Sequence, residues 1–557
     1  MECYTRRVDI PSDKQIHNPR NIPALLVLAA FLSALLLFSD VEAAPQVQWI
    51  QFQDGRLIYG KDELGNRIPD FSTAGYEGGG VSIPDVPVHA TLDPLPAGDD
   101  TPRIQSAIDA LAKQPLDANG FRGALLLHAG TYRIAGTINL NASGIVLRGE
   151  GSGEAGSNLT VLIAQGAPRS LIRIAGEGSW QASGHRHDIL DDYVPVGANA
   201  ITVDDDNDLK AGDRIIVQWS MDAAFIHSIG MDKIPPRRNG GTVRQWEPGM
   251  KLRFDRRIVA VDRADKGERI TLDAPLTTSM HRSEGTFVGR YTFPGRISHV
   301  GIENLRTDGS AFEKAPDFGN PQTRDDQDKF VGGGYFDSLF AAFDSVENAW
   351  MRNVVVAHYP RIVSIDQFAR AVTVRHIQGI DINTPETSAP PHAFGIDGQQ
   401  NLVEDCSVAG AYNHVLMTQS RVAGPNVFRN CSAKGAHLDA GPHERWATGT
   451  LYENLRIEGA IRIENRSNMG SGHGWSGANN VLWNCEAESY VVQTPPGAYN
   501  WAFGMKGSLD NAEAERLERR RGQWIPENRP GQIISPGNRV EPPSLYEKQL
   551  KERLHQK

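Results

Sequence analysis

The chain has 557 residues, of which 40% are hydrophobic and 22% charged, with 56 Gly and 33 Pro. This composition excludes a disordered or fibrous chain and supplies enough apolar material for a large core. The 57 basic residues, 43 Arg and 14 Lys, are outnumbered by 67 acidic ones, and the formal charge of −10 argues against a nucleic-acid-binding protein. Four Cys in this length exclude a disulfide-stabilised scaffold.

Residues 1–43 are predicted to be a signal peptide. Basic residues precede an apolar run at residues 24–38, which is shorter than the roughly 20 residues of a membrane span. The sequence Val41-Glu42-Ala43 then fits signal-peptidase cleavage after Ala43. We therefore expect an extracytoplasmic protein, which is secreted, periplasmic or on the cell surface, with no membrane contact beyond this signal. An uncleaved signal anchor is the alternative.

Residues 44–186 contain a predicted amphipathic helix followed by strand-like segments. The helix is expected at residues 98–110 (GDDTPRIQSAIDA), and the strands at residues 123–134 (GALLLHAGTYRI) and 145–151 (IVLRGEG). This order resembles the start of the pectate-lyase superfamily, whose pectin-lyase-like members are single-stranded right-handed parallel β-helices that begin with a capping helix. The resemblance covers residues 99–165 closely and implies this fold and a carbohydrate ligand. Since the superfamily contains lyases, hydrolases, epimerases and phage tailspikes, the reaction is not implied.

Residues 187–295 interrupt this pattern with short strands and hairpin-type turns, at residues 194–197, 201–203, 212–217, 254–261 and 270–272. We expect a small antiparallel β subdomain inserted between early coils of the helix. Arg237, Arg238, Trp246 and Arg253 of this insertion are candidates to overhang a groove, with exposed loop residues as the simpler interpretation.

Residues 296–507 are predicted to form the main coils of an all-β, right-handed parallel β-helix. Three-residue units recur with a period of about 24 residues, each with a polar second position and an apolar or small third position. The units are Glu303-Asn304-Leu305, Arg352-Asn353-Val354, Arg375-His376-Ile377, Glu404-Asp405-Cys406, Arg429-Asn430-Cys431, Glu453-Asn454-Leu455 and Trp483-Asn484-Cys485. Equivalent residues of neighbouring coils stack about 4.8 Å apart. We therefore expect a polar ladder at a turn and an inward apolar stack that includes three cysteines.

Residues 508–557 form a charged tail that ends in a predicted helix. Leu545, Leu550 and Leu554 would lie on one face of that helix. We expect this face to pack on the last coils.

Among the intervals between repeat units after the first one, two, of 29 and 30 residues, are longer than the others, and their extra residues follow the same stacked position. These insertions are residues 385–392 and 467–475, and residues 441–446 hold the equivalent place between them. If the coils stack in register, the three segments frame a groove on one side of the helix. The preceding strands would present side chains from residues 361–366, 394–397, 412–418, 437–439 and 462–466 to this groove.

The candidate catalytic residues in this groove are cationic or titratable. They are His414, His443, Arg445, Arg466 and His473. β-Elimination at a uronic acid needs a cation at the carboxylate, a base for the C5 proton and an acid for the leaving oxygen. Arg445 or Arg466 would provide the cation, and the histidines the proton transfer. For any single histidine, a surface or turn-stabilising role is the alternative.

The candidate substrate-binding residues are carboxylates and indoles of the same groove. They are Asp366, Asp397, Glu444, Trp446 and Trp475. Asp366 and Asp397 are expected on neighbouring coils at about the carboxylate separation of a retaining glycosidase. Solvated strand-end aspartates or a Ca²⁺ ligand pair are the alternatives, and the indoles fit packing against coil edges as well as sugar stacking. No protein metal site is predicted, and Ca²⁺ is the one cofactor that the resemblance suggests.

Three functions remain open. The first is a secreted polysaccharide lyase that cleaves an acidic, uronate-containing glycan. The second is a glycoside hydrolase that uses Asp366, Asp397 or Glu444, and the third is a non-catalytic glycan-binding or adhesive β-helix. Residues 410–414 lack the paired aspartates of the superfamily's polygalacturonases, and the arginine signature of its pectate lyases is absent. All three functions predict a polysaccharide or oligosaccharide partner.

Overall fold

The computed structural model describes residues 47–153, 158–204, 208–237, 240, 242–312, 338–382, 392–410, 412–436, 439–510 and 529–555. The predicted signal at residues 1–43, the groove segment at residues 385–391 and Arg238 lie outside these residues. Within the part that is described, no helix is long and apolar enough to cross a membrane.

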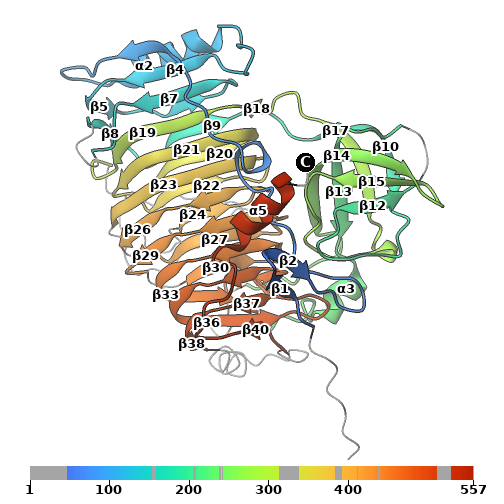
Figure 1. Ribbon diagram of the computed structural model, residues 1–557. Coiled ribbons are helices and arrows are strands. Elements are labelled where there is room, and N and C mark those ends of the chain that lie inside the picture. The colour runs from blue at the N-terminus through green and yellow to red at the C-terminus, as the bar shows by residue number, and fades with distance from the viewer. Residues whose placement is uncertain are drawn as a thin grey trace, which may run out of the picture. The chain divides into compact units, whose positions relative to one another are not determined.

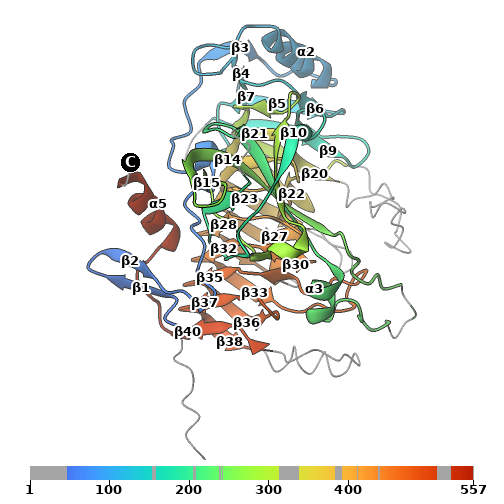
Figure 2. The same ribbon diagram turned by 90° about the vertical axis from the view of Figure 1, so that its right-hand side faces the viewer.

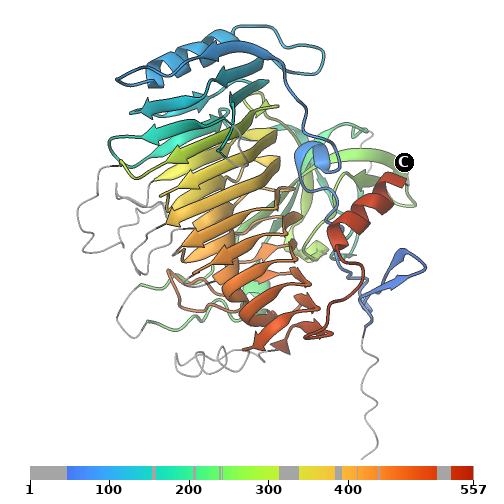
Figure 3. The ribbon, with the colours of Figure 1, turned by 60° about the vertical axis from the view of Figure 1, so that its left-hand side comes forward.

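The main body is a parallel β-helix, as predicted, in which strands stack coil upon coil in three columns (Figure 1, Figure 3). Each coil adds a strand to a column, so a strand pairs in parallel with its equivalents on the coils before and after it. In the third column, for example, β22 (Arg361–Ile365) pairs with β24 (His392–Ile396), which pairs with β27 (His414–Ser420). This register establishes the fold.

The other strands of the helix fall into the same columns. The first column contains β3 (Val88–Leu92), β4 (Gly123–Leu127), β7 (Ile145–Gly149), β25 (Leu402–Glu404), β28 (Asn426–Arg429), β32 (Thr450–Glu453), β35 (Val481–Trp483), β37 (Trp501–Phe503) and β40 (Gln532–Ile534). The second contains β5 (Gly130–Ile134), β8 (Thr160–Ala164), β26 (Ser407–Gly410), β29 (Ser432–Lys434) and β38 (Lys506–Leu509). The third also contains β6 (Ile138–Leu140), β9 (Ser170–Ala175), β20 (Leu339–Asp344) and β30 (Asp439–Glu444).

Longer strands pass from one column to the next. They are β19 (Gly301–Asp308), β21 (Val346–Ala357), β23 (Arg370–Ile382), β33 (Arg456–Ile463) and β36 (Glu486–Thr494). Short strands complete the coils, namely β18 (Ile297–Ser298), β31 (Ala447–Thr448), β34 (Gly477–Ala478) and the antiparallel β39 (Arg529–Pro530).

The seven repeat units stack as predicted. All seven second residues have a left-handed φ of 52–57°, which Asn and Asp tolerate better than most residues. Asn430 Nδ2 donates to Asp405 Oδ1 (3.0 Å) and Asn353 Nδ2 to Asn304 Oδ1 (2.9 Å), so the ladder bonds coil to coil. The third residues all lie in the core of the helix, and the three described cysteines among them are buried and free.

A helix caps the first coils of the β-helix. Helix α2 (Thr101–Ala112) lies at the N-terminal end of the stack (Figure 1) and buries Ile104, Ile108 and Leu111 against the first coils, as predicted for a capping helix.

Helix α5 (Leu545–His555) corrects the prediction for the tail. Of the predicted face, Leu545 is buried and Leu550 half-buried, but Leu554 is 46% exposed, and Tyr546 and Gln549 are buried beside Leu545. The helix does not pack on the last coils alone, because Tyr546 Oη donates to the carbonyl of Ala74 (2.7 Å), in the segment that carries the 3₁₀ helix η1 (Tyr76–Gly78). The β-hairpin β1 (Ile50–Gln53)–β2 (Arg56–Tyr59) lies beside it (Figure 1).

The predicted insertion is an antiparallel subdomain that leaves the helix after β9 and returns at β18. Its six-stranded sheet has the order β10 (Gln181–Asp188), β17 (Phe287–Thr292), β13 (Arg214–Ser220), β14 (Lys251–Arg263), β15 (Glu268–Leu272) and β12 (Ala200–Val203). The pair β11 (Tyr193–Val194)–β16 (Met280–His281), helix α3 (Ala223–Ser228) and the 3₁₀ helix η2 (Arg282–Glu284) complete it. Figure 2 shows the subdomain in front of the middle coils.

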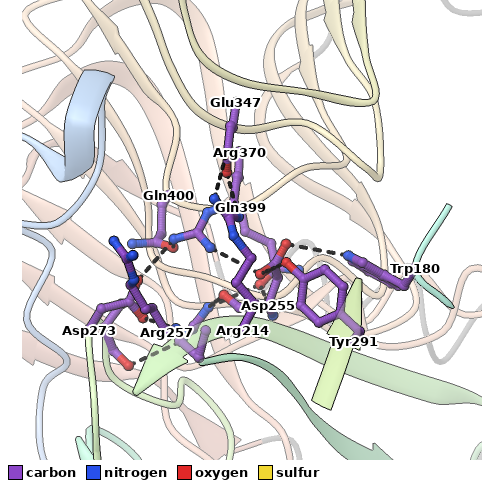
Figure 4. A network of polar contacts seen from close by, with 12 residues as sticks. Trp180, Arg214, Asp255, Arg257, Asp273, Tyr291, Glu347, Arg370, Gln399 and Gln400 are labelled. Carbon is purple, nitrogen blue, oxygen red and sulfur yellow. Dashed lines mark hydrogen bonds and ion pairs between the residues drawn. The ribbon is translucent and has the colours of Figure 1, made fainter. Parts of the chain in front are cut away.

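Two sets of contacts fix the subdomain to the helix. Its apolar core extends into the coils, where it includes Trp446 and Trp475. A buried polar network adds ionic contacts (Figure 4): Asp255 of β14 lies 3.0 Å from Arg370 of β23 and accepts a hydrogen bond from Tyr291 of β17 (2.6 Å). The subdomain therefore forms a fixed wall beside the third column of strands.

Candidate functional site

The third column of the helix carries a row of polar side chains at the start of its strands. The register places Arg361, His392, His414 and Asp439 on four successive coils, at the first residues of β22, β24, β27 and β30. All but Arg361 are at most 6% exposed. Apolar residues normally fill buried positions of this kind. Four different polar side chains in register therefore indicate a candidate functional site.

Asp439 bonds to two cationic or titratable side chains of the site. Its Oδ1 accepts a hydrogen bond from His414 Nδ1, and its Oδ2 accepts one from Arg466 Nη2 (2.9 Å). Burial alone would raise the pKa of Asp439, but Arg466 and His414 outweigh burial and hold that pKa below its ordinary value. With Nδ1 donating to the carboxylate, neutral His414 has its acceptor lone pair on Nε2.

His443 lies between two other imidazoles. Its ring centroid is 4.6 Å from that of His414 and 4.7 Å from that of His473. Arg466 Nη1 donates to His443 Nδ1 (3.0 Å), and because arginine has no acceptor, this nitrogen is unprotonated. Burial, with His414 and Arg466 beside it, lowers the pKa of His443 well below its ordinary value. His443 is therefore neutral, with its proton on Nε2.

His473 forms a second imidazole–carboxylate pair. Its Nδ1 lies 2.6 Å from Glu444 Oε2, and Arg445 Nη1 lies 3.1 Å from the same oxygen. Burial lowers the pKa of His473, and Glu444 opposes only part of that effect. Three adjacent imidazoles thus have carboxylate partners at both ends, an arrangement that can hold and move protons.

The subdomain positions the loop that carries His473. The amide of Arg244 donates to the carbonyl of Ser471 (2.8 Å), and Asn468 Nδ2 donates to the carbonyl of Pro236 (3.1 Å). Pro236 and Arg244 of the insertion therefore hold the predicted groove segment at residues 467–475 in place. The repeat pattern does not predict this contact.

A carboxyl pair lies at the opposite ends of the same strands. Asp366 follows β22 and Asp397 follows β24, and the amide of Asp397 donates to the carbonyl of Ile365 (2.7 Å), which confirms that the two aspartates stand on neighbouring coils. Both are half-buried. Burial raises the pKa of Asp366, and burial together with Asp366 and Glu444 raises the pKa of Asp397 well above its ordinary value.

Asp397 opens into a pocket of about 430 Å³ between the helix and the subdomain. The pocket is lined by Trp180, Gly249, Lys251, Arg253, Gln367, Asp397, Gln399, Ser420, Arg421 and Ala423. Ser420 is the register partner of Glu444, so this pocket adjoins the Glu444–His473 pair. The pocket joins one acid of raised pKa to three cationic side chains and one indole.

The predicted tryptophans do not line this site. Trp446 and Trp475 are 1% and 0% exposed in the core shared with the subdomain, where Trp475 Nε1 donates to the carbonyl of Ile229 (3.1 Å). Neither ring face is open to a sugar, so the packing alternative describes both. Trp246 is buried in the same core, whereas Arg253 does line the pocket.

The structure also adds residues to the predicted set. Asp439 follows Cys431 by the same interval by which His414 follows Cys406 (431 to 439 and 406 to 414), a signal present in the repeat that identified neither residue as a partner of the other. His392 is the last residue of the predicted insertion at residues 385–392 and has no such signal. Trp180 and Lys251 belong to or border the insertion, so no property of the repeats indicates them.

No known family model matches the chain, and no curated protein matches it. Solved structures are similar to it at low identity. The tailspike protein gp49 from Pseudomonas phage LKA1 is 13% identical over 74% of this chain and 56% of its own, with a TM-score of 0.39. Thus the match spans little more than half of that tailspike.

Two further solved structures are similar in the same range. The alginate lyase from Paenibacillus sp. str. FPU-7 is 8% identical over 81% of this chain and 99% of its own, with a TM-score of 0.36. The tailspike of E. coli bacteriophage HK620, solved in complex with a pentasaccharide, is 10% identical over 86% of this chain and 64% of its own, with a TM-score of 0.37.

Proposed function

We propose that the protein is an extracytoplasmic polysaccharide-cleaving enzyme and that it hydrolyses an acidic glycan bound between the third strand column and the subdomain. The observation that carries this proposal is the Asp366–Asp397 pair. Asp397 lines an open pocket, and Asp366 stands on the neighbouring coil, about 4.8 Å away along the helix axis and directly before Gln367 of the pocket lining. Glycoside hydrolases use such a pair of carboxyl groups for catalysis.

The two carboxyl groups suit different roles. The raised pKa of Asp397 favours its protonated form, which can donate a proton to the leaving glycosidic oxygen. Burial raises the pKa of Asp366 less than that of Asp397, and the Ser364 hydroxyl, which donates to Asp366 Oδ1 (2.7 Å), opposes that rise, so Asp366 is the more readily ionised of the two. Asp366 is then the nucleophile or stabilising carboxylate. The coil spacing favours the short separation of a retaining enzyme.

The rest of the pocket supports an acidic substrate. Lys251, Arg253 and Arg421 place positive charge around the pocket, and guanidinium groups bind carboxylates with two parallel hydrogen bonds. Trp180 supplies an indole of the kind that stacks on sugar faces. The lysine comes from the insertion, although the repeats themselves are almost without lysine.

A lyase is the second candidate, because His414 and His473 each have a carboxylate partner at Nδ1 and can accept a proton at Nε2. The two arginines that we expected to bind the uronate carboxylate argue against the lyase. Arg466 is paired with Asp439 and Arg445 with Glu444, so each would have to exchange a buried partner for substrate. In a lyase, that role would fall to Arg253 and Arg421 of the pocket.

Products from a panel of acidic polysaccharides test the proposal. Hydrolysis is expected to release new reducing ends without the ultraviolet absorbance of an unsaturated uronate. Reducing ends with that absorbance would instead establish the lyase. Binding without any cleavage across the panel would contradict both and favour a glycan-binding β-helix.

A further inference from the structure

A second cluster of polar side chains lies in the antiparallel subdomain and has no part in the proposed cleavage. His185 and His187 belong to β10, and Asp208 precedes β13. One ligand atom from each residue lies within 4.8 Å of the other two. Among the residues that the structure describes, this is the one trio of His, Cys, Asp or Glu side chains found in such a geometry.

A β-bulge in the edge strand β10 forms the cluster. Ala182 pairs with Tyr291 and Arg186 with Gly289, so residues 183–185 all face Arg290. Gly184 in this bulge has a φ of 87°, and a Cβ there would lie 2.9 Å from Arg290 Nη2. Bulges re-aim side chains, and here the His185 and His187 ring centroids are 4.6 Å apart.

The buried atoms of the cluster point at one another without hydrogen bonding. His187 is 1% exposed, and its Nε2 lies 3.0 Å from Asp208 Oδ1. The two atoms are not aligned for a hydrogen bond, and each is a buried polar atom without a hydrogen-bond partner. Leaving such atoms unsatisfied is costly, and a cation that both coordinate would remove the cost.

Hydrogen bonds with neighbouring residues leave His187 Nε2 and Asp208 Oδ1 available as metal ligands. His187 Nδ1 donates to Asp204 Oδ1 (3.0 Å), which leaves the lone pair on Nε2. Arg290 Nη2 donates to Asp208 Oδ2 (2.6 Å), which leaves Oδ1 for an ion. A carboxylate that orients the far nitrogen of a ligand histidine is the usual outer support of a zinc site.

We propose that His185, His187 and Asp208 bind one Zn²⁺ ion. Two imidazole nitrogens and one carboxylate oxygen suit zinc, whereas Ca²⁺ prefers ligand sets made of oxygen alone. His185 has a 54% exposed side chain, so the ion is reached from solvent and keeps a position for water. The ion joins the edge strand β10 to the segment before β13. Trp180 of the pocket directly precedes β10, so the ion also supports the pocket wall.

Titration of the untagged, chelator-treated protein with ZnCl₂ by calorimetry tests this site. We expect one Zn²⁺ per chain, a rise in the melting temperature with zinc, and no such rise with the same concentration of CaCl₂. His185→Ala, which alters an exposed side chain, is expected to weaken zinc binding at least tenfold. His187→Ala is expected to abolish it, with circular dichroism as the check on folding.

The matched control is His227→Ala. His227 belongs to another His–Asp contact of the same subdomain, with Nδ1 2.8 Å from Asp232 Oδ2, and lies outside the trio. This control is expected to bind zinc as the wild type does. Unchanged zinc affinity in folded His185→Ala, or equal losses in His185→Ala and His227→Ala, would overturn the proposal, as would a wild type that binds no zinc.

Discussion

The turn edge and the groove edge of this helix use the same stacking in opposite ways. At the turn edge, Asn and Asp residues and one His repeat at a left-handed φ, and Asn430 bonds directly to Asp405 of the preceding coil. At the groove edge, successive coils carry an arginine, two histidines and an aspartate, and Asp439 bonds both along the column and to Arg466 of a later loop.

This difference separates scaffold from site. A repeated residue type solves the same backbone problem on every coil, so the ladder needs only its neighbours. Unlike residues in register cannot repeat one bonding pattern, so Asp439 bonds to His414 along the column and to Arg466 of a later loop. Where a solenoid keeps its register but changes its chemistry, a functional site is the first hypothesis to test.

The largest expected effect distinguishes the two edges by activity. Asp397→Asn removes the proposed proton donor, and we expect kcat to fall by at least about 100-fold, measured as reducing-end release. Its melting temperature should stay close to that of the wild type, because the change removes a carboxyl whose charged form burial already disfavours. Asp405→Asn makes the same chemical change at the turn edge and should keep full activity. Full activity in Asp397→Asn, with loss in His473→Gln, would favour the lyase.

The second effect concerns stability. Asp439→Asn removes the nearer of two carboxylates beside the buried Arg466 guanidinium, and losing one partner of a buried ion pair costs about 3–5 kcal/mol. Asp405→Asn, an exposed site, should change the free energy of unfolding by less than about 0.5 kcal/mol. Urea denaturation measures the free energy of unfolding of both variants. Equal losses would show that the ion pair at the groove edge contributes no more to stability than the ladder does.

A third prediction uses pH. Burial, with Arg361 and His414 beside it, lowers the pKa of His392 well below its ordinary value. Below about pH 6.5 this histidine is protonated in the unfolded chain but stays neutral in the folded chain. The free energy of unfolding therefore falls as pH falls, by up to about 1.4 kcal/mol per pH unit for each such histidine. His392→Gln should flatten this acid-side slope. Asn430→Ala changes no titratable group and should retain it.

The smallest effect tests the ladder itself. Asn430 has a φ of 52°, and alanine in the left-handed region costs about 1–2 kcal/mol. We expect Asn430→Ala to lose about that much stability, whereas Asn430→Gly, which adopts this φ without strain, should lose less. Denaturation midpoints of the two variants compare them. A glycine variant as unstable as the alanine variant would show that the side-chain bond to Asp405 matters more than the backbone conformation.

Much of the fold is visible in the sequence because stacking repeats local rules. The period of the units places Cys406, Cys431 and Cys485 in one inward stack, and the order of segments predicts the capping helix and the insertion. The site is less visible. The repeat predicts His414 and the Asp366–Asp397 pair on their strands, but it also predicts Trp446 and Trp475 in the groove, because burial against an inserted subdomain leaves no mark on the repeat.

The sequence by itself determined the coil, since a period of about 24 residues with one polar turn residue per coil fixes which residues share a column. It also determined which chemistry was present: histidines, arginines and aspartates concentrated on one side. Only the tertiary structure decided how they pair. Arg466 lies against Asp439 and not open to substrate, and Trp180 and Lys251 complete a pocket with Asp397. Those contacts join segments far apart in the chain, and packing, not local periodicity, brings such segments together.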